Sequence, residues 1–327
     1  MTVLVTGSAG HLGEGLVRTL RSAGRPVFGL DAKASTLTDR VGSILERPFV
    51  RESLEGVSAV IHAATLHKPH LATHSFQDFV DTNVTGTRIL LEEAVAAGVE
   101  CFVYTSTTSV FGNAMSPGPD QPAVWVTEEL GPEPKNVYGL TKLLAESLCE
   151  LFHHRFGLPV MVLRTSRFFP EADDDVAIRN SYEPANVQAN EMLYRRVDIE
   201  DVVTAHLLAI AKADSIGFAR YIISATSPFE PGDLAELRID APGVVNRLFP
   251  ESEALYAARG WKLLPTIGRV YVNQLARSEL DWEPKYDFRH VLECLRGNRD
   301  FRSALARVVG SKGYHDRTFD DGPYPVA

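Results

Sequence analysis

The sequence predicts an α/β protein with a doubly wound, parallel sheet and a smaller C-terminal lobe that would bind substrate. Short apolar runs alternate with stretches of helical period, which is typical of strands and helices in βαβ order. One run, Ala59–Ala64, is continuous enough to be buried on both faces, as in a parallel sheet. A glycine-rich loop, residues 7–13, joins the first run to the first helical stretch.

The expected elements follow in chain order. Strands are predicted at residues 3–6, 26–30, 59–64, 101–106, 160–164 and 219–224, and helices from Leu12 to Gly24 and at 76–97, 137–156 and 199–213. Residues 168–196 and 225–290 form the predicted lobe, because polar or Pro- and Gly-rich stretches there break the alternation. Residues 1–167 and 197–224 then form the sheet domain. The polar tail, 311–327, could be disordered or reach a partner subunit.

Composition excludes several classes of protein. The net charge of −9 argues against nucleic acid and anionic membranes as main partners. No apolar run approaches the roughly 18 residues of a membrane span, and the N-terminus enters a strand with no leader before it. Three scattered cysteines, Cys101, Cys149 and Cys294, lack metal or redox spacing. We therefore expect a cytoplasmic protein without a metal site.

The glycine loop predicts a dinucleotide site in a Rossmann-type fold. Gly7 lets the chain turn, Gly10 lets backbone amides approach a pyrophosphate, and Gly13 lets the helix pack on the strand. His11 and Leu12 belong to the same loop. Asp31 ends the second strand, where a carboxylate could accept hydrogen bonds from ribose hydroxyls and repel a 2′-phosphate, which favours NAD over NADP. Alternatively, Asp31 could only cap a turn.

Tyr138 and Lys142 are candidate catalytic residues. They lie four apart and so share one face of the predicted helix 137–156. A nearby ammonium should lower the pKa of the phenol from about 10, which would make it usable as an acid or base near neutral pH. A strand rich in hydroxyls, Tyr104–Gly112, precedes this helix.

Together these motifs resemble the extended short-chain dehydrogenase/reductase family, also called the NAD-dependent epimerase/dehydratase family. The resemblance runs from Thr2 to about Phe288 and also rests on "HAA" (62–64), "NVTGT" (83–87), "VDIEDV" (197–202) and "ELDWEPKYDF" (279–288). It implies a homodimer formed through the helices at 76–97 and 137–156.

The same resemblance implies roles for individual residues. Tyr138 would be the acid/base, Lys142 would lower its pKa and hold the nicotinamide ribose, and Thr107 would hydrogen-bond the reacting oxygen. Asn83 would help to order the site. The cofactor would also contact the residues Ala63, Ala64, Asn83, Ser166 and Phe168.

Departures from the family pattern bear on the substrate. Thr108 and Ser109 stand where 4,6-dehydratases place an Asp-Glu pair, which argues against that reaction. Arg167 could bind a carboxylate or phosphate, or pair with Glu171 or Asp173. The segment 167–196 is short for a nucleotide-sugar enzyme, so a smaller or different substrate is plausible.

Other candidate substrate contacts are Thr108, Arg195, Arg196, His67, Lys68 and His70, although the last three could be plain loop residues. The run "EADDD" (171–175) is interpreted as an exposed acidic face. We expect an NAD-dependent oxidoreductase or epimerase acting on a secondary alcohol of a sugar or nucleotide-sugar-like substrate. The alternatives are an NAD(P)-dependent dehydrogenase or reductase of a non-nucleotide metabolite, and a non-catalytic NAD-binding regulator.

Overall fold

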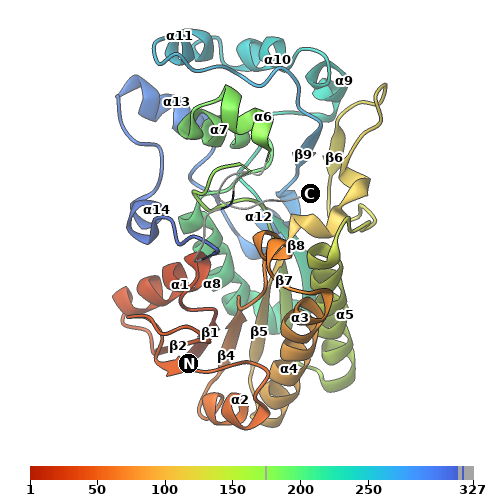
Figure 1. The fold of residues 1–327 in the computed structure, drawn as a ribbon, viewed down its shortest axis with the longest axis vertical. Coiled ribbons are helices and arrows are strands. Elements are labelled where there is room, and N and C mark those ends of the chain that lie inside the picture. The colour runs from red at the N-terminus through yellow and green to blue at the C-terminus, as the bar shows by residue number, and fades with distance from the viewer. Residues whose placement is uncertain (174, 316–318, 320–327) are drawn as a thin grey trace.

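The computed structural model describes residues 1–173, 175–315 and 319 (Figure 1). Within these residues, seven parallel strands form the central sheet in the order β3-β2-β1-β4-β5-β7-β8. The strands are β1 (Val3–Thr6), β2 (Val27–Asp31), β3 (Arg40–Val41), β4 (Ala59–His62), β5 (Cys101–Thr107), β7 (Val160–Thr165) and β8 (Phe218–Ile223). The order reverses between β1 and β4, which confirms the doubly wound α/β class.

Helices cover both faces of this sheet (Figure 1). On one face, α1 (His11–Ser22), α8 (Ile199–Ile216) and α12 (Gln274–Leu280) enclose a core that includes Leu16, Val203 and Trp282. On the other face, α2 (Arg47–Ser53), α4 (Gly86–Ala96) and α5 (Val137–Phe156) enclose a second core. Strands β1, β4 and β7 are buried along their whole length, as expected for a sheet covered on both sides.

The helix α5 matches the predicted bounds. Its N-cap, Asn136, accepts a hydrogen bond from the Gly139 amide at 3.0 Å, and Gly157 ends it in the left-handed conformation. Three leucines of this helix, Leu140, Leu144 and Leu151, do not face the core and are 37%, 44% and 51% exposed, whereas Leu148 is partly buried against it. The buried face instead carries Tyr138 and Lys142 with small residues between them.

The helix predicted at 76–97 is interrupted. It consists of α3 (Phe76–Val80), a π-helical turn at Asp81–Thr85, and α4. Such wide turns occur often at functional sites. Here the wide turn contains Asn83, whose side chain is buried beneath the loop that follows β4.

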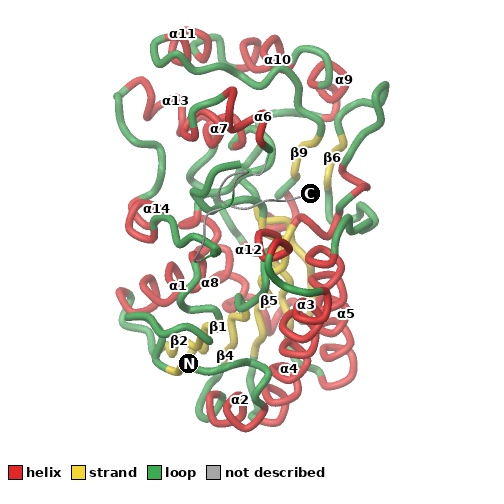
Figure 2. The backbone as a smooth tube through the Cα atoms, viewed as in Figure 1, coloured by secondary structure: helices red, strands yellow, loops and turns green. Residues whose placement is uncertain are grey.

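A smaller lobe lies at the top of Figure 1 and is mainly helix and loop in Figure 2. Strands β6 (Val124–Val126) and β9 (Arg269–Tyr271), which the sequence did not predict, pair in parallel at its base. Its helices are α6 (Val176–Ser181), α7 (Pro184–Glu191), α9 (Leu234–Leu237), α10 (Ala241–Leu248), α11 (Ser252–Ala257) and α13 (Phe288–Arg296). We retain 168–196 and 225–290 as the proposed substrate-binding lobe.

Asp201 on α8 fixes the chain segment that returns from α12. Its carboxylate accepts hydrogen bonds from the amides of Lys285 and Tyr286 at 2.9–3.0 Å, and its carbonyl oxygen accepts one from the Trp282 indole at 3.1 Å. The motifs "VDIEDV" and "ELDWEPKYDF" therefore meet in space. Beyond them, α14 (Ala304–Val309) packs against α1 and α8.

Candidate active site

The candidate site is an open cavity at the carboxyl edge of the sheet. The segments that follow β1, β4, β5 and β7 all line it, as do the start of α1 and the buried face of α5. Ligands of open parallel sheets bind at this edge, outside the point where the strand order reverses.

The glycine loop has the geometry that a bound pyrophosphate requires. Gly7 has a φ of +76°, and a Cβ atom there would lie 2.8 Å from the backbone nitrogen of Ala64. A Cβ atom at Gly13 would lie 1.9 Å from the carbonyl oxygen of Gly7. Helix α1 begins at His11 without a side-chain cap, so its first amides are directed toward the cavity edge. Gly7, Gly10, His11, Leu12 and Gly13 all line the cavity.

Asp31 lies at the end of β2 beside this loop. Its carboxylate accepts hydrogen bonds from the amides of Ala9 at 3.0 Å and Lys33 at 2.8 Å. The turn-capping role is therefore present, and it also ties β2 to the glycine loop. Asp31 is not among the residues that line the cavity, and neither is Ala64, whereas Ala63 is.

Tyr138, Thr107 and Lys142 lie together on the cavity wall. Tyr138 is 7% exposed, and its phenol is hydrogen-bonded to the Thr107 side chain. Lys142 donates a hydrogen bond from Nζ to the carbonyl oxygen of Thr105 at 2.7 Å and lies over the Tyr104 ring. The structure thus brings the three predicted catalytic residues to one place.

The pKa of Tyr138 is shifted upward in the structure, whereas the sequence predicted a downward shift caused by Lys142. Burial raises the pKa of Tyr138 to about 12, although the hydrogen bond with Thr107 opposes that rise. Burial also lowers the pKa of Lys142 to about 7, while the nearby carboxylate of Glu146 opposes that change. Burial dominates because it disfavours the charged form of both groups.

Asn83 lies behind the cavity wall and not on it. Its Oδ1 accepts hydrogen bonds from the Thr65 hydroxyl and the Leu66 amide, both at 2.8 Å, while its Nδ2 donates to Thr141 at 3.0 Å. It therefore joins α5 to the loop after β4 and positions the site, as its family role implies. A direct contact with cofactor, which was also predicted for it, is not supported by this placement.

Among the predicted substrate contacts, His67, Thr108 and Arg167 line the cavity, but Arg196 does not. Arg196 is buried and pairs with Glu191 at 2.7 Å, and it also donates to the carbonyl oxygen of Phe169. The prediction that Arg196 contacts substrate in this cavity is therefore wrong. Arg195 points the other way and does line it.

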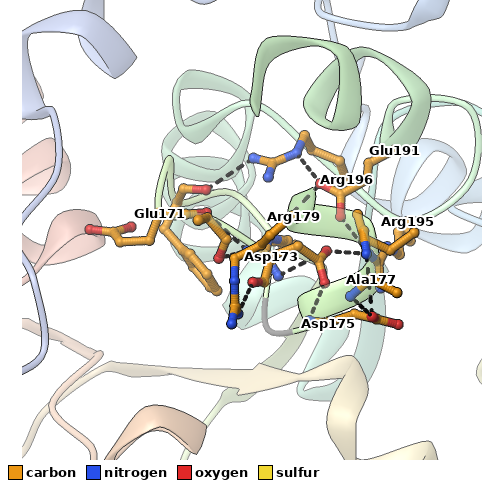
Figure 3. Close-up of polar contacts among 12 residues, drawn as sticks. Glu171, Asp173, Asp175, Ala177, Arg179, Glu191, Arg195 and Arg196 are labelled. Atoms are coloured by element: carbon orange, nitrogen blue, oxygen red, sulfur yellow. Dashed lines mark hydrogen bonds and ion pairs between the residues drawn. The ribbon is translucent and has the colours of Figure 1, made fainter. Parts of the chain in front are cut away.

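Arg167 takes part in a network of charges that Figure 3 shows in part. It donates to the carbonyl oxygens of Glu171 and Ala172 at 2.9 and 2.8 Å and lies 3.6 Å from the carboxylate of Asp173. Arg167 therefore pairs with Asp173, which was one of the two predicted alternatives, and it also lines the cavity. Glu171 and Asp173 have side chains only 6% and 2% exposed, so interpreting the acidic run as an exposed face was wrong for these two residues.

The cavity wall is cationic. Among the described residues that line it there is no aspartate or glutamate, whereas five cationic side chains do: Lys68, Lys142, Arg167, Arg195 and Arg269. Arg195 is held between Asp173 and Glu191, with 2.7 Å to each carboxylate. The site is therefore suited to an anionic ligand.

Sequence reasoning missed several lining residues. Arg269 and Tyr271 come from β9, and Met115 from the segment that follows β5. Tyr314 comes from the part of the polar tail that the structure describes; most of that tail, including 320–327, lies outside the described residues. No local pattern marks these four residues, because distant segments bring them to the cavity.

A model of the NAD-dependent epimerase/dehydratase family matches residues 3–223. The chain belongs to this family. The resemblance and the family's cofactor, NAD, agree with the predictions. No group of three or more metal-binding side chains occurs in the described residues, and none of their helices is long and apolar enough to cross a membrane.

Similar proteins include the uncharacterized protein y4nG of Sinorhizobium fredii, 33% identical over 247 residues that make up 72% of this chain and 58% of that protein. Sterol demethylase protein B of Methylococcus capsulatus is 34% identical over 68% of this chain and 70% of its own length. UDP-glucose 4-epimerase of Erwinia amylovora is 32% identical over 45% of this chain and 47% of its own length. The chain thus spans less than two thirds of the first and third of these relatives.

Two solved structures resemble the whole fold. A short-chain dehydrogenase/reductase superfamily protein from Agrobacterium tumefaciens with bound NAD has a TM-score of 0.65 and 25% identity, covering 91% of this chain and 98% of that one. MoeE5 in complex with UDP-glucose and NAD has a TM-score of 0.62 and 26% identity, covering 90% and 96%. A dimeric state and a cytoplasmic location stay predictions.

Proposed function

We propose that this protein is an NAD-dependent enzyme that acts on a secondary alcohol of a sugar-like substrate, with Tyr138 as its acid/base. The observation that carries the proposal is the placement of Tyr138, Thr107 and Lys142 on the wall of the same cavity that the glycine loop opens into. A phenol beside a dinucleotide site can take or return a hydroxyl proton while the carbon is oxidised or reduced.

The residues present fit the cofactor. The loop from Gly7 to Gly13 would hold the pyrophosphate at the start of α1, and Asp31 stays the proposed partner of the adenosine ribose. Ser166, at the end of β7, lines the cavity, and its buried hydroxyl has no hydrogen-bond partner among the described residues, as expected of a group that faces a ligand. We propose that Ala63 and Phe168 flank the same ligand. When bound, NAD supplies the acceptor for a hydride.

The protein's own groups handle the proton. With a pKa of about 12, Tyr138 is protonated at neutral pH, so it can accept a proton only once the phenolate has formed. A protonated Lys142 on the same helix face would favour the phenolate, and Glu146 favours the protonated form of Lys142. Thr107 would hydrogen-bond the reacting oxygen and so hold it next to the phenol. Water is excluded because both Tyr138 and Lys142 are almost fully buried.

The cationic wall favours a substrate that carries phosphate or carboxylate. MoeE5 is described with UDP-glucose, which is an anionic sugar nucleotide. Thr108 and Ser109 line the cavity where an acid and a base would be needed to eliminate water, so we propose epimerisation or dehydrogenation and not 4,6-dehydration.

A second candidate is the oxidation or reduction of a non-nucleotide metabolite. Two observations favour it: the apolar lining residues Leu12, Met115, Phe168 and Phe169, and the similarity to sterol demethylase protein B over about two thirds of each chain. A large apolar wall suits a substrate with an extended hydrocarbon face.

The test combines purified protein, NAD and candidate substrates, both nucleotide sugars and non-nucleotide alcohols. Net formation of NADH indicates a dehydrogenase, while product without NADH indicates an epimerase. Tyr138→Phe should lose at least about 100-fold in kcat, the lower limit usual for a general acid or base. Tyr256→Phe is the matched control, because Tyr256 is also a buried tyrosine, and its hydroxyl has no hydrogen-bond partner among the described residues. Full activity of Tyr138→Phe would refute the proposed role.

We also propose a homodimer that buries the outer face of α5. Leu140, Leu144 and Leu151 are exposed on this helix, and Phe76 on the neighbouring α3 is 61% exposed. Figure 1 shows α3, α4 and α5 side by side on one flank of the molecule. An apolar stripe of this kind on two adjacent helices is typical of a helical interface between subunits.

A further inference from the structure

The C-terminal segment 310–315, which we call the strap, crosses the mouth of the candidate active site. It follows α14 and makes contacts with three separate segments, two in the sheet domain and one in the loop after β7. Lys312 forms an ion pair with Glu14 on α1, and His315 Nε2 lies 3.0 Å from the carbonyl oxygen of Pro69 in the loop after β4. Ser311 donates to Glu171 in the loop after β7 at 2.8 Å.

Tyr314 is the strap residue that lines the cavity. Its ring centroid lies 6.0 Å from those of His11 and Phe169, 6.0 Å from that of His67, and 5.9 Å from that of His70. Tyr314 therefore fills the space between the glycine-loop helix and the loop after β4. The His67 ring in turn lies 6.1 Å from that of Tyr138. Only the His67 side chain therefore separates Tyr314 from the candidate acid/base, Tyr138.

Glu171 joins the strap to His11 at the start of α1. Its Oε1 lies 2.7 Å from His11 Nε2 and accepts hydrogen bonds from the Ser311 hydroxyl and the Lys312 amide. Figure 3 shows this side chain directed away from the cluster of arginines that surrounds Asp173. Burial would raise the pKa of Glu171, but the hydrogen bonds from His11 and Ser311 lower it to about 2. The carboxylate is therefore charged at neutral pH, and charge-assisted hydrogen bonds are the strong ones.

We propose that the strap is a lid over bound NAD, and that Tyr314 is a positioning residue which packs against the cofactor and slows its release. This inference rests on the proposed function only in taking NAD as the ligand of the cavity. Two features support it: Tyr314 lines the same cavity as the glycine loop, and the strap is anchored at α1, at the loop after β4 and at the loop after β7, all of which border this cavity. Release of NAD then requires the strap to detach from Glu171.

The first experiment measures NAD dissociation by stopped-flow in the absence of any substrate. Glu171→Gln and Tyr314→Ala should each speed dissociation by about tenfold, which corresponds to the loss of about 1.4 kcal/mol. Tyr314→Phe should remain close to wild type, because it keeps the ring. A chain that ends at Gly310 should dissociate at least as fast as either point variant, while removal of 320–327 alone, which leaves the strap, should change little.

Two different failures can be told apart. If wild-type protein does not bind NAD, the cofactor assignment in the proposed function fails. If it binds NAD but all strap variants release it at the wild-type rate, only the lid inference fails.

Limited trypsin digestion gives a second and independent measurement. Cleavage after Lys312, followed by mass spectrometry, reports how often the strap detaches. Bound NAD should slow this cleavage, because Tyr314 gains a contact with it. Unchanged cleavage would mean that the strap makes no contact with the cofactor, and faster cleavage would mean that the cofactor displaces the strap. Either result overturns the proposal.

Discussion

Mild acid should destabilise the fold through histidines that are buried in the neutral form. Burial lowers the pKa of all of them: to about 3 for His62 and His67, and to about 4 for His70 and His206. The unfolded chain binds protons at these side chains near pH 6.5, whereas the folded chain does not. The stability that they contribute is therefore complete above about pH 6.5 and is lost as the pH falls toward about 3.

His62 gives the clearest case, because its hydrogen bonds determine its tautomer. Thr87 donates its hydroxyl hydrogen to the carbonyl oxygen of Asn83, so it can only accept from His62 Nε2 at 2.9 Å. His62 Nδ1 is then the acceptor for the Thr6 hydroxyl at 2.7 Å, while Thr6 itself accepts from the Ala64 amide. A proton added to Nδ1 would break this chain of hydrogen bonds inside the core.

The magnitude follows from the two pKa values. Between pH 7 and pH 5, a histidine with a pKa of about 6.5 in the unfolded chain and about 3 in the folded chain lowers the free energy of unfolding by about 2 kcal/mol. Replacing His62 by glutamine removes this titration. The substitution can change the free energy of unfolding at pH 7 by any amount. Between pH 7 and pH 5, however, the free energy of unfolding of the variant should fall by about 2 kcal/mol less than that of wild type.

Urea denaturation followed by fluorescence at pH 7 and pH 5 measures this difference. His154→Gln is the matched control, since His154 is an exposed histidine near the end of α5, and it should keep the wild-type pH dependence. If His62→Gln and wild type lose the same free energy between the two pH values, the assignment of a buried neutral His62 is refuted.

Further predictions concern single contacts. Gly7→Ala should weaken NAD binding, and it should lower the free energy of unfolding by more than the ~1–2 kcal/mol that a left-handed alanine costs, because its Cβ would also meet a backbone atom. Gly24→Ala is the control: its φ is +66° but the space around it is open, so it should cost only ~1–2 kcal/mol in urea denaturation. Arg164→Met leaves the buried Glu146 with the Ser106 hydroxyl and the more distant Arg220, and it should cost about 3 kcal/mol in the same assay; a loss under 1 kcal/mol would contradict a buried ion pair. Leu144→Glu should convert the proposed dimer to monomer in light scattering, and an unchanged mass would exclude this interface.

Periodic features of the chain could be predicted from sequence. The strands of the sheet, the glycine loop and the helix that carries Tyr138 follow from apolar period and from end signals such as Gly157. Strand β3 has only two residues, and β6 and β9 have only three each, so all three are shorter than the runs of 4–8 residues by which strands are predicted. Their pairing depends on partners far away in sequence.

The positions of the site residues could be predicted from the sequence, but their pKa values could not. The four-residue spacing places Tyr138 and Lys142 on one face of α5, yet their pKa values depend on burial, which spacing does not reveal. Arg195 and Arg196 are adjacent in sequence and equally plausible as substrate contacts. Arg195 lies in the turn after α7, whereas Arg196 pairs with Arg167 in a short bridge, and only Arg195 reaches the cavity.

The charges around the cavity explain how a chain with a net charge of −9 can bind an anion. Asp173 and Glu191 lie behind the wall, where they pair with Arg195 and hold its guanidinium in place. The carboxylates face the protein interior, and the arginine forms part of the surface that a ligand would contact. Net charge governs solubility and long-range attraction. The charge of the ligand that the cavity accepts depends instead on the local arrangement, in which the carboxylates lie behind the wall and the guanidinium of Arg195 lies at its surface.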